Sequence, residues 1–102
     1  MKLYIDTTNS EKIIVGLDEE RFETDAKKER AQRLLPFIDE VLKKQGKRIG
    51  DISQVEVKAG PGSFTGIRVG MAVAMTIGWS LGVKVNGKDM RRGEVVEVVY
   101  GE

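Results

Sequence analysis

Two short polar stretches contain residue types that could bind a phosphate or another anion. The first, Asp6-Thr7-Thr8, directly follows a short apolar run. A carboxylate and hydroxyls at the carboxyl end of a strand can hold phosphate and Mg²⁺. The second stretch contains Gly62 and Ser63 and precedes a long apolar segment. A glycine-rich loop that opens a helix presents free backbone N–H groups to an anion. The candidate anion-binding residues are therefore Asp6, Thr7, Thr8, Gly62 and Ser63.

The same stretches also have a structural interpretation, which we favour. Asp6 and the threonines after it are typical of turns in which a side chain bonds to the backbone, and Ser63 is a candidate helix N-cap. No Lys-Ser or Lys-Thr pair follows the glycines, so the loop does not match the P-loop, and its spacing differs from the dinucleotide fingerprint. Arg68 lies one turn into the helix, where it could pair with a phosphate, with a partner's carboxylate or with a group of its own chain.

Composition excludes several kinds of chemistry. The 102 residues include no cysteine and no histidine, which excludes disulfides, thiolate–zinc sites, cysteine nucleophiles, histidine bases and histidine-ligated metals. A net charge of +1 gives no overall electrostatic argument for a nucleic-acid or membrane binder. We predict no catalytic residue, no metal ligand and no cofactor, and we expect a cytoplasmic protein.

The hydrophobic pattern that must position these residues predicts an α/β fold. Apolar residues occur in short strand-like runs and recur at spacings of three and four in two helix-like segments. The predicted strands cover residues 3–5, 12–17, 21–24, 54–58 and 83–85, and the predicted helices cover residues 26–45 and 63–81. Short turns indicate antiparallel pairing of the first three strands, whereas strand–helix–strand connections indicate parallel pairing. The prediction is a mixed five-stranded sheet with two main helices, in one domain over residues 1–102.

Proline and glycine refine this prediction. Pro36 inside the first helix predicts a kink near Gln32–Pro36, and Gly46 predicts the end of that helix. A C-terminal tail is expected from about residue 86. Its Asn86-Gly87 pair is a strong turn signal, and the run Val95–Tyr100 predicts a short strand, with a terminal hairpin across Lys88–Glu94.

The second helix carries small residues at every fourth position, and these form a stripe along it: Gly62, Gly66, Gly70, Ala74, Gly78 and Gly82. A glycine inside a helix costs about 1 kcal/mol relative to alanine. Close packing against another backbone is the usual compensation, so we expect the stripe to lie against the sheet or the first helix. A narrow, more polar edge is expected at Thr65, Arg68, Ala72 and Thr76.

Large apolar residues flank the stripe on both sides, so the helix is apolar over well over half of its circumference. A small two-helix domain cannot easily bury such a helix on all sides, which predicts a partner chain and an oligomer. Methionine and tryptophan are suited to such interfaces. The candidates for internal and interchain helix packing are Leu34, Ile38, Val41, Ile67, Arg68, Met71, Met75 and Trp79.

Three stretches in this order resemble the TsaB (YeaZ) family: Ile5-Asp6-Thr7-Thr8, then Arg33-Leu34-Leu35-Pro36-Phe37-Ile38-Asp39, then Gly60-Pro61-Gly62-Ser63-Phe64-Thr65-Gly66-Ile67-Arg68-Val69-Gly70. The last motif is long and quite specific, and the resemblance extends from Met1 to about Asn86. It implies an RNase H-like lobe of the actin/Hsp70/sugar-kinase type.

The resemblance also implies a function. TsaB-like proteins resemble a catalytically silent relative of TsaD. They pair with TsaD through two helices and, with the ATPase TsaE, support threonylcarbamoyl transfer to tRNA. TsaD-type subunits carry paired metal-binding histidines, which this chain lacks. The expected role is thus a non-catalytic scaffold or activating subunit with a TsaD-type partner, a TsaE-type ATPase beside it, indirect contact with tRNA, a homodimer in isolation and no membrane association.

One departure from the family is large, because its members usually have a second lobe. Here the chain passes from Gly82 almost directly to a tail that is faintly similar to the family's C-terminal end. We therefore expect a minimal form without that lobe. Two alternatives remain open at this stage: a nucleotide- or phosphate-binding module completed by a partner chain, and a small stand-alone dimeric interaction domain.

Overall fold

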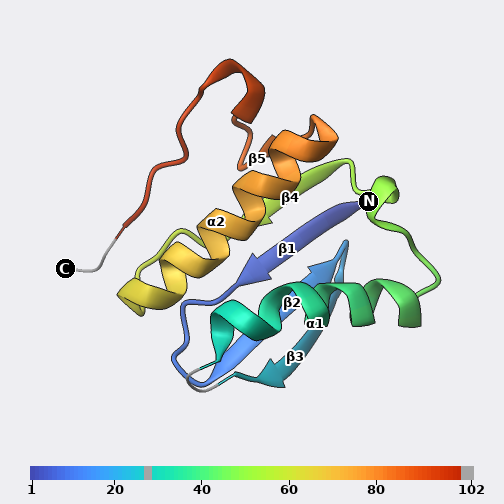
Figure 1. Cartoon of the computed structure of the whole chain (residues 1–102), viewed down its shortest axis with the longest axis vertical. Helices are drawn as coiled ribbons and strands as arrows, with labels where there is room; N and C mark the ends of the chain where they lie inside the picture. Colours follow the sequence, from blue (N-terminus) through green and yellow to red (C-terminus); the bar gives the residue numbers. More distant parts are fainter. Residues whose placement is uncertain (27–28, 100–102) are drawn as a thin grey trace.

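The computed structural model describes residues 1–26 and 29–99, in which a five-stranded sheet carries two helices (Figure 1). The strands are β1 (Lys2–Asp6), β2 (Lys12–Leu17), β3 (Glu20–Asp25), β4 (Gln54–Val57) and β5 (Lys84–Val85). The helices are α1 (Arg30–Lys44) and α2 (Phe64–Leu81), with the short 3-10 helices η1 (Ile49–Asp51) and η2 (Met90–Arg92). The strand order is β3-β2-β1-β4-β5, antiparallel among β1, β2 and β3 and parallel from β1 through β4 to β5. The predicted mixed sheet is confirmed.

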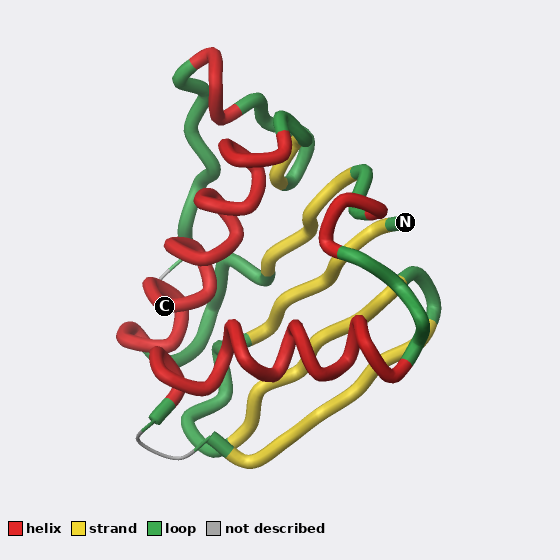
Figure 2. The backbone as a smooth tube through the Cα atoms, turned by 45° about the vertical axis from the view of Figure 1, so that its right-hand side comes forward, coloured by secondary structure: helices red, strands yellow, loops and turns green. Residues whose placement is uncertain are grey.

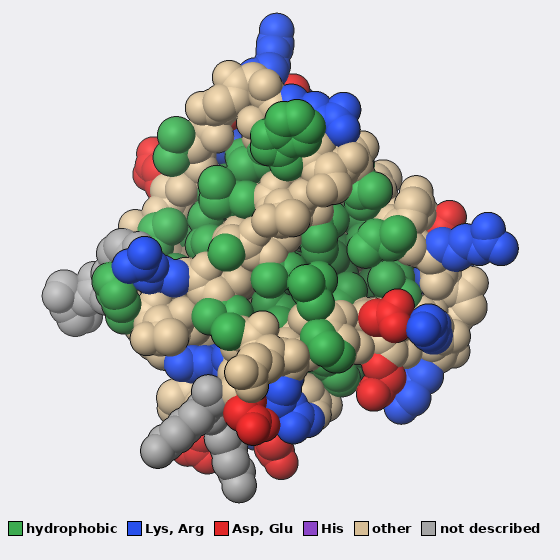
Figure 3. All heavy atoms as spheres, in the orientation of Figure 1, with side chains coloured by type: hydrophobic (Ala, Val, Ile, Leu, Met, Phe, Trp, Pro, Cys, Tyr) green, Lys and Arg blue, Asp and Glu red, His purple; other side chains and the backbone are tan. Residues whose placement is uncertain are grey.

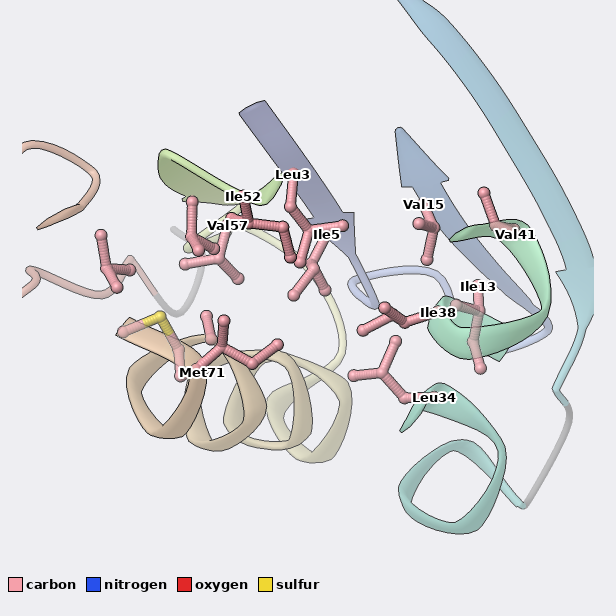
Figure 4. Packing of buried hydrophobic residues seen from close by; sticks show 14 of the residues in the cluster. Leu3, Ile5, Ile13, Val15, Leu34, Ile38, Val41, Ile52, Val57 and Met71 are labelled. Carbon is pink, nitrogen blue, oxygen red and sulfur yellow. The ribbon is translucent and has the colours of Figure 1, made fainter. Parts of the chain in front are cut away.

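Alternation along the strands determines which face of the sheet is buried. Leu3 pairs with Leu17 and Val55, and Ile5 pairs with Val15 and Val57, so the buried residues of three strands share one face. Both helices cover this face (Figures 1 and 2). Figure 4 shows the side chains of the sheet pointing toward Met71 of α2 on one side and toward the apolar side of α1 on the other. The core is therefore a single layer between the sheet and the helix pair.

The helix ends follow the predicted capping chemistry. The Ser63 hydroxyl accepts a hydrogen bond from the Gly66 N–H at 3.2 Å and caps α2. Gly82 ends this helix with φ 68°, and Gly46 follows α1 with φ 66°. Helix α1 is continuous from Arg30 to Lys44 and contains Pro36, so the proline does not interrupt it.

Helix α1 begins later than residue 26, where the periodicity placed its start. Ala26 is buried at the end of β3, and its N–H donates to the Glu11 carbonyl at 2.9 Å, so this residue extends the strand edge. Residues 27 and 28 lie outside the described residues. The hydrogen bond from Ala26 to Glu11, just before β2, thus outweighs the helical periodicity of the sequence at this position.

The stripe of small residues on α2 faces the sheet, as predicted. A side chain at Gly66 would collide with the Thr7 carbonyl, one at Gly70 with the Thr7 side chain, and one at Gly78 with Val85. The Thr7 hydroxyl donates to the Gly66 carbonyl at 2.5 Å, which pins the first turn of α2 to the end of β1. By length and composition α2 could cross a membrane, but a single helix of this kind is weak evidence for a span, and its stripe of small residues packs on the sheet.

The C-terminal region differs in part from the prediction. A tight turn at Asn86-Gly87 joins Val85 and Lys88 in a single antiparallel bridge, so a minimal hairpin is present. The run Val95–Val99 forms no strand, and Tyr100 lies outside the described residues. The chain after η2 runs back along α2 instead of joining the sheet (Figures 1 and 2), because Val96 packs into the core beside this helix.

Candidate functional site

The structure brings all five candidate anion-binding residues together at the carboxyl end of β1. The Ser63 N–H donates to the Thr8 carbonyl at 2.8 Å, and a side chain at Gly62 would collide with Thr8. The loop before α2 is therefore held directly against the turn after β1. Residues about sixty positions apart in the chain thus form one polar corner, as the order of the elements predicts.

The polar atoms of this corner are occupied by one another. One oxygen of Asp6 accepts from the Thr8 N–H at 2.9 Å and from the Thr8 hydroxyl at 2.6 Å, which is a side-chain-stabilised turn. The Thr7 hydroxyl is bonded to α2 and the Ser63 hydroxyl caps it. Among the residues that the structure describes, no group of acidic side chains could hold a metal ion. This geometry favours the structural interpretation, and anion binding stays an untested prediction.

Five of the eight candidates for helix packing lie inside the core, with between 0 and 7% of their surface exposed: Leu34, Ile38, Val41, Ile67 and Met71. Figure 4 shows Leu34, Ile38 and Val41 of α1 turned toward Ile13 and Val15 of the sheet. Burial therefore assigns these five to internal packing, the first of the two roles considered for them. Arg68, Met75 and Trp79 are exposed.

The winding of α2 explains why one row of residues divides in this way. Ile67, Met71, Met75 and Trp79 are four positions apart, and a helix of 3.6 residues per turn rotates such a row by roughly 40° at each step. The row starts in the core at Ile67 and reaches the surface at Trp79, which is 60% exposed. The row of Val69, Val73 and Ile77 starts on the other side of the core-facing stripe, so the same rotation carries it from half-buried to buried. Residues spaced four apart on this helix therefore do not all lie on the same face of it.

The outer surface of the helix pair carries large exposed apolar side chains, which we call the helix face: Leu35 of α1 and Phe64, Met75 and Trp79 of α2. Between 40 and 60% of each side chain is exposed. Figure 3, which views this side of the molecule, shows hydrophobic side chains gathered over both helices. Leu35 and Phe64 were not among the predicted interface residues. The position of Leu35 off the buried row Leu34–Ile38–Val41 is the signal in the sequence that could have identified it.

Apolar grooves flank the exposed edge of α2. One, of about 530 Å³, lies between Ala31 of α1 and the first half of α2. Another, of about 640 Å³, lies between Met75 and the segment after η2. Ala72 lines both grooves, and Thr76 is also exposed. The predicted edge Thr65, Arg68, Ala72 and Thr76 is therefore confirmed as an exposed ridge of small and polar residues beside the two grooves, which we call the crest.

Arg68 stands on this crest at the boundary of the two grooves. Its guanidinium lies 5.4 Å from the centre of the Phe64 ring. No carboxylate of residues 1–26 or 29–99 forms an ion pair with it. Glu94, which lines the same groove, accepts from the Asp89 N–H at 2.7 Å. The helix face is therefore apolar, with Arg68 at its centre and the Arg91 guanidinium 5.2 Å from the centre of the Trp79 ring at its edge.

The opposite face of the sheet is charged. Lys2 pairs with Glu56 at 2.9 Å and Lys12 with Glu23 at 3.1 Å, and the Arg21 guanidinium lies 3.8 Å from the centre of the Tyr4 ring. Burial, and next the Asp6 carboxylate, raises the pKa of the Tyr4 phenol from its ordinary value of 10.0. The two sides of the molecule thus differ in chemistry, and the apolar side is made of helices.

The fold and the helix face define a single α/β lobe with one apolar, exposed side. Comparison with known proteins gives the family. A family model described as "TsaD: tRNA N6-adenosine threonylcarbamoyltransferase" matches residues 23–87, more than half of the chain. In an alignment of 123 positions, gaps included, the chain is 34% identical to tRNA threonylcarbamoyladenosine biosynthesis protein TsaB of Bacillus subtilis. It is 38% identical to the TsaB of Escherichia coli over 58 residues. The chain belongs to this family, in its TsaB (YeaZ) group.

Solved structures support the same fold. YeaZ from Pseudomonas aeruginosa superposes with a TM-score of 0.70 at 24% sequence identity, over 82% of this chain and 41% of that protein. The chain spans about half the length of the B. subtilis relative, 54%, with 96% of its own residues matched. The match to the E. coli relative covers 57% of this chain and 24% of that protein.

Proposed function

We propose that this chain is a non-catalytic subunit in the formation of tRNA threonylcarbamoyladenosine, and that it pairs with a TsaD-type subunit through its helix face. The relatives named as TsaB biosynthesis proteins support the pathway. The absence of histidine and cysteine from the sequence supports a role without catalysis of its own. In this proposal a TsaE-type ATPase completes the assembly, tRNA is contacted through the partner, and the complex works in the cytoplasm.

The observation that carries the proposal is the exposure of Leu35, Phe64, Met75 and Trp79 on one side of the molecule. Large apolar side chains gathered on one surface of a small domain mark an interaction site. The grooves beside the crest of α2 offer hollows for a partner's side chains, and the small residues Ala72 and Thr76 allow a partner helix to approach closely. Trp79 is the expected anchor, since tryptophan is enriched among residues that dominate binding energy.

In this proposal Arg68 contributes more to the orientation of the bound partner than to the affinity of the pair. A cation at the centre of an apolar surface favours a partner with a carboxylate at the matching position. In the absence of a TsaD-type subunit, a second copy would place two such cations near each other. We therefore propose that the homodimer in isolation is the weaker pair and that the TsaD-type subunit displaces it.

The nucleotide-binding alternative has less support. The hydroxyls of Thr7 and Ser63 and the carboxylate of Asp6 are engaged in the bonds that join β1 to α2. A ligand would have to replace those bonds before it could use these groups.

The test is to mix the chain with the TsaD-type protein from the same source and to measure the complex by size exclusion with light scattering. Leu35→Glu and Trp79→Glu each place a charge on the helix face and should weaken the pair by about 2 kcal/mol or more, roughly thirtyfold. Ile49→Glu is the matched control, because Ile49 is 47% exposed but lies in η1, away from this face (Figure 1).

Mass spectrometry of tRNA nucleosides then measures threonylcarbamoyladenosine made with the TsaD- and TsaE-type proteins. The helix-face variants should lower its yield in proportion to lost pairing, and Ile49→Glu should not. Wild-type chain that stays monomeric at micromolar concentration and does not bind the TsaD-type protein would refute the pairing. Pairing without any effect on the modified nucleoside would refute the proposed pathway.

A further inference from the structure

The segment Val95–Val99 after η2 has the side-chain alternation of a strand. Val95 is 72% exposed, Val96 only 7%, and Val99 51%. Glu97 between them is exposed, and Val98 is half-buried against the core. Val96 and Val98 therefore point toward α2, Glu97 and Val99 are exposed, and Val95, although exposed, borders the groove beside Met75. This period of two is typical of a strand with one face on a core.

The backbone of this segment is almost entirely unpaired. The Val99 N–H donates to the Ala59 carbonyl at 2.7 Å, but the backbone groups of residues 95–98 make no hydrogen bond to any described residue. Backbone groups alternate in direction along an extended chain, so residues 95 and 97 point to the same side as Val99. The groups of Val96 and Val98 point to the opposite side, where no described residue bonds to them, and we call this side the open edge.

We propose that Val95–Val99 is an edge strand that binds an extended segment of another protein by strand addition. An apolar segment with high strand propensity and unpaired N–H and C=O groups is a template for such pairing. The main-chain groups of Val96 and Val98 supply the hydrogen bonds. The groove of about 640 Å³ between this segment and Met75 gives room for side chains of the added strand that point inward.

The side chains of the segment specify the chemistry of the occupant. Its outward row is apolar at both ends with a carboxylate in the centre, so the matching strand has apolar residues with a lysine or arginine opposite Glu97. A second copy fits less well. The sequence Val-Val-Glu-Val-Val reads the same in both directions, so full antiparallel pairing of two copies places Glu97 opposite Glu97. Like charges directly opposite each other destabilise a strand pair.

The test uses a fluorescein-labelled peptide of sequence Ser-Thr-Val-Val-Lys-Val-Val-Thr-Ser with an amidated end, and measures its anisotropy against the full chain. We expect saturable binding that Val98→Pro weakens by about tenfold or more, because proline removes an open-edge donor. Val95→Pro is the matched control: it removes a donor on the Ala59 side and should change binding by less than about twofold. A peptide with glutamate in place of the lysine should bind more weakly.

A second measurement does not depend on how the variants fold. N-methylation of alternate peptide amides blocks only one edge of the peptide. One methylated series should abolish binding to the wild-type chain and the other should retain it. Absence of saturable binding, equal weakening by both proline variants, or equal binding of both methylated peptides would overturn the proposal. Sedimentation that shows a wild-type dimer disrupted by Val98→Pro would also overturn it, in favour of a second copy.

Discussion

Alanine at Gly66 should destabilise the protein although it improves helix propensity. The glycine carbonyl accepts the Thr7 hydroxyl at 2.5 Å, and an added Cβ would collide with the Thr7 backbone and lie 2.8 Å from the Arg30 guanidinium. Alanine gains about 1 kcal/mol over glycine inside a helix. Overpacking against a fixed group costs about 1–3 kcal/mol, and separation of α2 from β1 also removes the Thr7 bond, worth about 1 kcal/mol. We expect a net loss of roughly 1–3 kcal/mol in the free energy of unfolding.

The assay is urea unfolding followed by circular dichroism, with the melting temperature as a second measure. A loss of 1 kcal/mol lowers the melting temperature by roughly 4–8 °C in a domain of this size. Two controls separate the contributions. Gly50→Ala meets nothing within 4 Å and should be neutral or stabilising by up to about 1 kcal/mol. Ala72→Gly on the exposed edge of α2 should cost about 1 kcal/mol through helix propensity alone.

A Gly66→Ala variant that is as stable as wild type, or more stable, would refute the reasoning. It would mean that α2 can move away from Thr7 at no cost, and that the small residues of α2 are not required for contact with the sheet.

Two further predictions concern the sheet. Asn86→Gly should lower the free energy of unfolding by about 1–2 kcal/mol in urea melts, because the Asn86 amide accepts from the Val57 N–H at 2.8 Å and donates to its carbonyl at 2.9 Å; glycine retains the φ of 49°, so an unchanged midpoint would contradict this assignment. In a Tyr100→Phe background, absorbance titration should give Tyr4 a pKa above 10.0, and Asp6→Asn should lower it. Because the folded pKa is raised, this phenol stabilises the fold below the unfolded pKa of about 10 and loses that contribution as pH rises through the folded value; stability that increases over this range would contradict the stated cause.

The fold was largely predictable because its signals are local. Alternating apolar residues in β1, β2 and β4 and the caps at Ser63 and Gly82 placed most elements, since each depends on neighbours within a few positions. The start of α1 was less predictable. Ala26 continues the helical period in sequence, yet a hydrogen bond to Glu11 keeps it with the strands, and a contact between distant residues leaves no periodic signal.

The candidate site was only partly predictable, for a geometric reason. The sequence identifies which residues of α2 are apolar but not the angle at which the helix meets the sheet. Contact of Gly66, Gly70 and Gly78 with β1 and β5 sets that angle, and the angle decides that Met71 is buried and Met75 exposed. The run Val95–Val99 shows the converse. Its strand propensity is evident from sequence, but propensity alone does not supply a neighbouring strand.

The ion pairs on the uncovered side of the sheet limit how far stacking can proceed. Lys2, Glu56, Lys12 and Glu23 keep their charges in water, and covering them with another layer would remove that hydration at a cost of several kcal/mol per ion. Two molecules joined through their helices would present these charged sheet faces to the outside. Stacking of such pairs sheet against sheet is therefore disfavoured, so a pair should not extend into a filament along that direction.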